Sequence, residues 1–171
     1  MRGVRLAPGI VFGAALLVWA PVVQAQDHGD DHQFHPHHVA VMVGGMTPLS
    51  ETSETSWALG VDYGYNFNER WGAGIGADFT IGDHKRAALF AGGISYSLLG
   101  GLKLGTGPGI EIVEKDQPSG GTKNSSYFVW WFGAAYEFHV GSLSIGPIVF
   151  LDFVGETKTN LTYGLTVGTG F

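Results

Sequence analysis

Large apolar residues alternate with small or polar ones through most of this 171-residue chain. The last segment shows the pattern most clearly, because Leu161, Tyr163, Leu165 and Val167 alternate with Thr162, Gly164, Thr166 and Gly168. A period of two places alternate side chains on opposite faces of a β-strand. We find eight such segments of roughly ten residues, each bounded by turn residues, which predict an all-β fold.

The two faces of the expected strands differ in the size of their side chains. One face is aromatic and aliphatic, while the other is mainly Gly, Ser, Thr and acidic residues. An eight-stranded barrel encloses a narrow interior that accepts the small residues but not the bulky ones. Closure also leaves no unpaired backbone edge in hydrocarbon. We therefore expect an eight-stranded antiparallel up-and-down transmembrane β-barrel with its bulky face in lipid, rather than a soluble barrel with an apolar interior.

The composition excludes several other classes of protein. The 28 glycines follow no three-residue period, which excludes a collagen, and the absence of Cys excludes a disulfide scaffold or a thiolate metal site. The formal net charge is −6 and the basic residues do not cluster. Nucleic acid is therefore not an expected partner.

The first 25 residues have the composition of a signal peptide. Arg2 and Arg5 precede an apolar run over residues 6–20, which is too short to cross a bilayer as a helix, and small residues precede Gln26. We expect cleavage after residue 25, a His- and Asp-rich periplasmic leader over 26–38 and a barrel over 39–171. Export combined with a barrel predicts the cell outer membrane as the location.

The expected connections between strands also alternate in character. Those at 68–70, 99–101 and 139–142 have the length of hairpin turns, whereas those at 47–56, 82–86, 114–126 and 155–160 are longer or more charged. Short turns at one end and longer loops at the other are typical of outer-membrane barrels, which keep the short turns in the periplasm.

From about Val39 to the terminal Phe171, the chain resembles the small Gram-negative outer-membrane barrels. That group includes the outer-membrane protein A barrel domain and outer-membrane proteins X and W. The resemblance implies that the barrel-assembly machinery is a partner and reads Phe171 as an assembly signal. It is architectural and carries no motif for one activity, and the short loops depart from the adhesin and invasin members. We further expect a monomer surrounded by outer-membrane lipid and lipopolysaccharide.

The leader is a candidate metal-binding segment. Five of the seven histidines lie in it, together with three Asp residues. Neutral imidazole and carboxylate suit Zn²⁺, Cu²⁺ or Ni²⁺, but the spacing matches no fixed structural zinc motif. A solvated polar leader without a metal role is the alternative interpretation. The candidate ligands are His28, His32, His35, His37 and His38.

Several charged residues fall on the face expected to line the barrel interior. They are Asp62, Asp78, Lys103, Glu111, Glu137 and Asp152. Lys103 and Glu137 are expected near the periplasmic ends of neighbouring strands, where they can form an ion pair. The remaining acids need water, a cation or loop lysines to compensate them. A packed polar core and a cation-attracting vestibule both stay open, as does whether the lumen is a pore or is plugged.

Five basic residues fall in or beside the expected outer loops. Lipopolysaccharide phosphates crowd the outer leaflet and pair well with Lys and Arg. Ordinary loop solubility is the alternative. The residues are Lys85, Arg86, Lys115, Lys123 and Lys158.

These observations predict a non-enzymatic outer-membrane barrel, structural or weakly permeable, that requires no cofactor. The alternatives are a narrow channel for small solutes and a lipid A-modifying hydrolase. Residue types suited to a hydrolase occur within one hairpin, at Glu137, His139, Ser142 and Ser144. That hairpin is expected at the periplasmic end, away from lipid A.

Overall fold

The computed structural model describes residues 35–49, 55–82, 85–116 and 122–171. Within these ranges there is no helix long and apolar enough to cross a membrane. A single 3-10 turn, η1, spans Leu99–Gly101. The strands are β1 (His37–Pro48), β2 (Ser56–Asn66), β3 (Trp71–Ile81), β4 (Lys85–Ser97), β5 (Leu102–Asp116), β6 (Thr122–Tyr136), β7 (Phe138–Val140), β8 (Leu143–Val154) and β9 (Lys158–Gly170).

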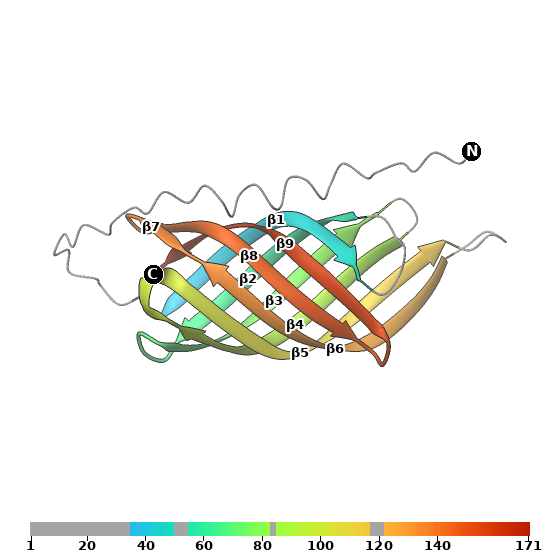
Figure 1. Cartoon of the computed structure of the whole chain (residues 1–171), viewed down its shortest axis with the longest axis horizontal. Helices are drawn as coiled ribbons and strands as arrows, with labels where there is room; N and C mark the ends of the chain where they lie inside the picture. The colour runs from blue at the N-terminus through green and yellow to red at the C-terminus, as the bar shows by residue number, and fades with distance from the viewer. Residues whose placement is uncertain (1–34, 50–54, 83–84, 117–121) are drawn as a thin grey trace. The chain divides into compact units, whose positions relative to one another are not determined.

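The strands form one antiparallel sheet that closes on itself (Figure 1). Sequence neighbours pair from β1 to β6, and β9 pairs with both β8 and β1. Pairing of β6 with β8 completes the barrel. The short β7 continues β6, because both lie along β8 with Ala135 opposite Ile148 and Phe138 opposite Ile145. The ladder lapses between them beside Pro147, which has no N–H to donate. The barrel therefore has eight strands, as the alternation predicts.

Side-chain exposure alternates along the strands as the sequence pattern predicts. In β1, Val41 is 48% exposed, whereas its neighbour Met42 is 1% exposed. In β9, Thr162 and Thr166 are buried, while Leu165 between them is half exposed. The large apolar residues thus cover the outside of the barrel. So continuous an apolar surface is unfavourable in water and favourable in lipid.

Strand β1 begins at His37, two residues before the expected start at Val39. The backbone N–H of His37 donates to the carbonyl of Phe171 (3.1 Å), and the N–H of Phe171 donates to the carbonyl of His37 (3.0 Å). Their rings stack with centroids 5.5 Å apart, and His37 Nδ1 lies 2.8 Å from the Tyr63 hydroxyl. His37 and His38, which composition assigned to the leader, therefore lie in the barrel because they complete the seam between β1 and β9.

The barrel has two ends with different connections. We call the end that holds the connections β2–β3, β4–β5 and β7–β8 the turn end, and the opposite end the loop end. The C-terminus lies at the turn end, on the left of Figure 1. At the loop end, β8 and β9 are joined by residues 155–157 alone, because β9 already starts at Lys158. This connection is shorter than the expected loop over 155–160.

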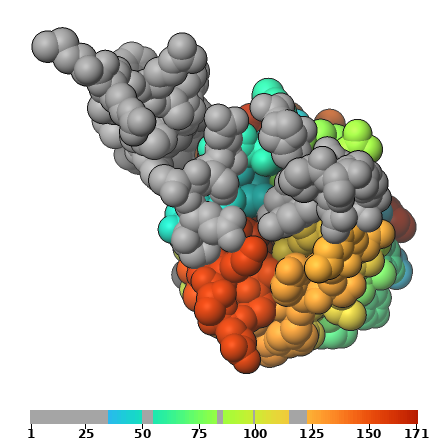
Figure 2. Space-filling model, turned by 90° about the vertical axis from the view of Figure 1, so that its right-hand side faces the viewer, coloured from blue at the N-terminus to red at the C-terminus, as the bar shows by residue number. Residues whose placement is uncertain are grey.

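A small apolar cluster lies inside the lumen on β1 and β2. Met42, Met46 and Ala58 form a buried cluster against which Ile148 and Phe150 pack. Val129, on the inner face of β6, has no exposed surface. Figure 2 looks onto the loop end, where atoms of β6 (orange) lie beside those of β8 and β9 (red-orange). Among the described residues, this cluster, which we call the plug, shares the loop-end half of the lumen with the buried polar residues Glu111, Asp152, Asn160 and Thr162.

Two inward glycines, Gly44 and Gly64, provide a matched test of how closely β1 and β9 approach each other. A Cβ atom at Gly44 would overlap the backbone of Tyr163 and Gly164 on β9, whereas one at Gly64 would meet only the Ala73 carbonyl, at 3.8 Å. We expect Gly44→Ala to lower the free energy of unfolding by about 1–3 kcal/mol, as overpacking does. Gly64→Ala should leave it within about 0.5 kcal/mol. Denaturant unfolding in detergent measures both variants, and equal midpoints would contradict the close approach of β1 and β9.

Candidate functional site

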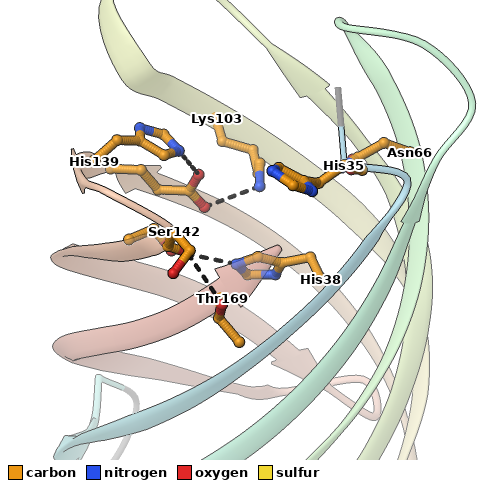
Figure 3. A network of polar contacts seen from close by, with 9 residues as sticks. His35, His38, Asn66, Lys103, His139, Ser142 and Thr169 are labelled. Atoms are coloured by element: carbon orange, nitrogen blue, oxygen red, sulfur yellow. Dashed lines mark hydrogen bonds and ion pairs between the residues drawn. The ribbon is translucent and has the colours of Figure 1, made fainter. Parts of the chain in front are cut away.

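Polar side chains converge inside the turn end of the barrel (Figure 3). Lys103 Nζ, from β5, donates to Glu137 Oε1 at 2.9 Å. Glu137 Oε2 lies 4.0 Å from His139 Nε2, and the Glu137 backbone N–H donates to the Gly101 carbonyl. The Lys103 and Glu137 side chains are only 24% and 13% exposed. The ion pair expected from the strand positions is therefore present and largely shielded from solvent.

A second polar contact joins β1 to β8. His38 Nε2 lies 3.3 Å from Ser144 Oγ, and Ser144 is buried. His139 faces Glu137 instead of a serine, and Ser142 contributes only its backbone carbonyl, which accepts a bond from Thr169 Oγ1. The histidine that reaches a serine is thus one that sequence reasoning had placed in the leader. A Ser–His contact is one part of a hydrolytic site, but the carboxylate of Glu137 is bound to Lys103.

The acidic residues expected inside the barrel do face its lumen. Asp62 and Asp78 lie over the glycines opposite them on the neighbouring strand, Gly76 and Gly60. Asp152 accepts a hydrogen bond from Thr162 Oγ1 at 3.2 Å. The fourth acid, Glu111 on β5, is 6% exposed. Asp62, Asp78 and Asp152 all line one cavity in the lumen.

A cavity of about 170 Å³ lies in the lumen, lined at the turn end by His38, Lys103 and Glu137 and farther in by Asp62, Asp78 and Asp152. Trp131 reaches into the lumen from β6, and its Nε1–H donates to the Gly92 carbonyl of β4 at 3.1 Å. The ring of Phe150 meets it edge to face, with centroids 5.8 Å apart. The volume corresponds to several water molecules. The inward glycines in the sequence indicate that the lumen contains free space. They do not indicate where a cavity lies or which residues line it.

The leader histidines within the described residues do not converge. His28 and His32 lie outside those residues. His37 faces outward against Phe171, while His38 faces inward toward Ser144, because adjacent residues of a strand point to opposite faces. His35 contacts Asn66 through its backbone carbonyl. In the part of the chain that the structure describes, no three His, Asp or Glu side chains are placed to hold a metal ion.

The basic residues singled out in the sequence all lie at the loop end. Lys85, Lys115 and Lys123 occupy adjacent positions in the register of β4, β5 and β6. The side chain of Arg86 is exposed on the outer face of β4. Lys158 Nζ lies 5.9 Å from the centre of the Tyr127 ring. The register thus gathers three of the five cations into one row.

Comparison with solved structures identifies the class of fold. Neisserial surface protein A matches with a TM-score of 0.67 and 8% identity, over 80% of this chain and 97% of that protein. Ail, the attachment invasion locus protein of Yersinia pestis, matches with a TM-score of 0.59 and 13% identity, over 81% and 100%. The N-terminal β-barrel domain of Pseudomonas aeruginosa OprF matches with a TM-score of 0.54 and 16% identity, over 81% and 100%. The sequence itself matches no protein-family model and no curated protein.

The chain therefore has the fold of the small eight-stranded outer-membrane barrels, as the alternation and the resemblance predict. The identities are low, so this agreement concerns the architecture and not a particular activity.

The shielded ion pair supplies a stability test. We expect Lys103→Met to lower the free energy of unfolding by about 1–3 kcal/mol, because it leaves the Glu137 carboxylate without its partner inside the lumen. The double variant Lys103→Met/Glu137→Gln should recover part of that loss. Glu69→Gln, on the exposed turn at 67–70, is the control and should have little effect. Denaturant unfolding of the wild type, the single variants Lys103→Met and Glu137→Gln, and the double variant gives the coupling energy, and a value near zero would show that the pair adds nothing.

Proposed function

We propose that this chain is an outer-membrane protein that spans the bilayer as a β-barrel and has a structural, non-enzymatic role. The observation that carries the proposal is the largely apolar outer face, on which Trp57 and Ile75 are 75% and 68% exposed. Soluble monomers rarely expose so large an apolar surface. The fold shared with outer-membrane barrels supports the same reading.

Aromatic residues near both ends of the outer face support a membrane-spanning orientation. Trp57, Phe128 and Phe153 lie toward the loop end, and Trp71 and Phe138 lie toward the turn end. Rings of this kind are typical of the two membrane–water interfaces of transmembrane barrels. The hydrocarbon region would then lie between the two sets.

The row of cations at the loop end favours placing that end at the cell surface. Lys85, Lys115 and Lys123 are adjacent in register, and Lys and Arg bind phosphate well. Lipopolysaccharide phosphates would be their partners. In this orientation the terminal Phe171 lies on the periplasmic side, where the barrel-assembly machinery would read it, after a signal peptide at 1–25 has directed export.

The plugged lumen favours a structural role over a channel. Met42 and Val129 are fully shielded, and Met42 packs with Met46 and Ala58 across the path that a solute would take. A hydrolase is less well supported. The buried Ser144 lies near the turn end, away from the proposed position of lipid A. Among the hydrogen bonds of the described residues, none joins His38, which contacts Ser144, to a carboxylate.

Conductance tests this role directly. In planar bilayers we expect no steady conductance from the refolded wild-type protein. Met42→Ala/Met46→Ala should open a measurable one, because it removes the plug. Val41→Ala, which shortens the outward-facing neighbour, is the control and should stay closed. A steady wild-type conductance that the double variant leaves unchanged would favour the channel instead. Loss of acyl chains from lipid A in cells that express the protein would favour the enzyme.

We further propose that the leader binds Zn²⁺, Cu²⁺ or Ni²⁺. Its density of imidazole and carboxylate groups supports this, since five of the seven histidines lie within residues 28–38. Because His37 and His38 are committed to opposite faces of β1, the ligands would come from His28, His32 and His35 and the neighbouring Asp residues. Such an open set suits buffering of metal ions rather than a fixed site.

A deletion that spares the barrel tests the leader. We expect removal of residues 27–34 to abolish Zn²⁺ binding in titration calorimetry while the barrel stays folded. His37→Ala should change the binding little, because that ring is stacked on Phe171. Binding by the full-length mature protein should fall between about pH 7.5 and about pH 5, because imidazoles become protonated. Equal affinity of the truncated and full-length proteins would leave the leader as a spacer only.

A further inference from the structure

The lumen cavity extends from the turn end as far as Asp78 and Asp152, which lie in the loop-end halves of β3 and β8. Asp62 and Asp78 enter it from β2 and β3. Trp131 enters from β6, and Phe150 and Ile148 enter from β8. In the closed order of the eight strands, β2 lies opposite β6 and β3 lies opposite β8. Asp62 and Asp78 therefore lie across the cavity from the strands that carry Trp131, Phe150 and Ile148, and β8 also contributes the carboxylate of Asp152.

Among the described residues, Asp62 and Asp78 have no cationic partner. Lys103, the basic residue of this cavity wall, is engaged by Glu137 at 2.9 Å, and His38 is engaged by Ser144. Within the described part of the chain, no ion pair forms at Asp62 or Asp78. Shielded carboxylates that lie near one another cost desolvation energy and repel when they are ionised. A positively charged group that enters the cavity would lower both costs.

The geometry distinguishes between a metal ion and an organic cation. No three His, Asp or Glu side chains of the described residues are placed to hold a metal ion. Beside Asp152, the opposite wall offers an indole and a phenyl ring, which attract an ammonium group and pack against hydrocarbon but provide no ligand for a metal. The Trp131 N–H is already bonded to the Gly92 carbonyl, so this wall adds no free donor that would favour an anion.

We propose that the lumen cavity binds a small organic ammonium ion. The nitrogen lies at Asp62 and Asp78, and the hydrocarbon part lies against Trp131 and Phe150. About 170 Å³ of space suits a short alkylammonium ion. Entry is from the turn end, where the wall is polar at Asn66 and Ser95 and where Lys103 is partly exposed. The buried Met42, which shares the space over Gly60 with Asp78, bounds the cavity on the β1 side, so we expect a blind pocket rather than a passage.

Two adjacent tryptophans allow the site to be read without a label. Trp131 lines the cavity, whereas Trp130 faces outward and donates its Nε1–H to Thr106 Oγ1 at 3.0 Å. We suggest titrating the folded mature protein, in uncharged detergent, with n-butylammonium chloride. The indole N–H signals are followed by nuclear magnetic resonance, with Trp131→Phe to assign the luminal one. We expect a saturable shift at Trp131 and none that saturates at Trp130.

Matched variants identify the carboxylates responsible. Asp78→Asn should weaken binding at least tenfold, and Asp62→Asn serves the same purpose if the first variant does not fold. Glu69→Gln removes one charge outside the cavity and should leave the affinity unchanged. The neutral analogue n-butanol should give no saturable shift at Trp131. Shifts that are linear and equal at the two indoles, or an affinity that both Asp variants keep, would overturn the proposal.

Discussion

The structure depends on closure of the backbone hydrogen-bond ladder. In hydrocarbon, each unpaired N–H or C=O costs several kcal/mol, so a sheet can span a bilayer only if its first and last strands also pair. Here β1 pairs with β9 over its length, and the backbone of His37 bonds reciprocally with that of Phe171 at the end of the seam. Pairing of β6 with β8 closes the remaining gap. The β6–β8 ladder lapses beside Pro147, and the β4–β5 ladder lapses at Gly92 and Gly93, beside Pro108.

Closure with eight strands fixes what the lumen can contain. The interior is narrow, so most inward positions are small residues. A large side chain fits there only where the residues beside it are small. Trp131 is an example, because its ring occupies the volume over Gly93 and Gly105. In the same way, Met42 and Met46 of β1 pack against the small side chain of Ala58 on β2. Where glycines meet no large partner, the polar cavity remains. The plug, the cavity and the ion pair are thus consequences of one geometric limit.

The sequence was sufficient for the features that depend on one strand or on one hairpin. Alternation predicted the strands and their two faces, and the spacing of Lys103 and Glu137 across neighbouring strands predicted their ion pair. Features that join strands distant in sequence were not predictable. The contact of His38 with Ser144 crosses β9 and depends on the stagger at the seam, which no local pattern encodes. Composition also obscured the start of β1, because His37 resembles the leader in type although its partners are Phe171 and Tyr63.

The central claim is that the bulky face of each strand lies in lipid and the small face lies in the lumen. The chain contains no Cys, so single cysteines can be placed without background. A fluorophore attached in turn at Leu165, Thr166 and Val167 of β9, in bilayers with a quencher on the lipid chains, reports which face each position occupies. We predict strong quenching at positions 165 and 167 and weak quenching at 166. Quenching that is uniform along β9, or strongest at 166, would contradict the account.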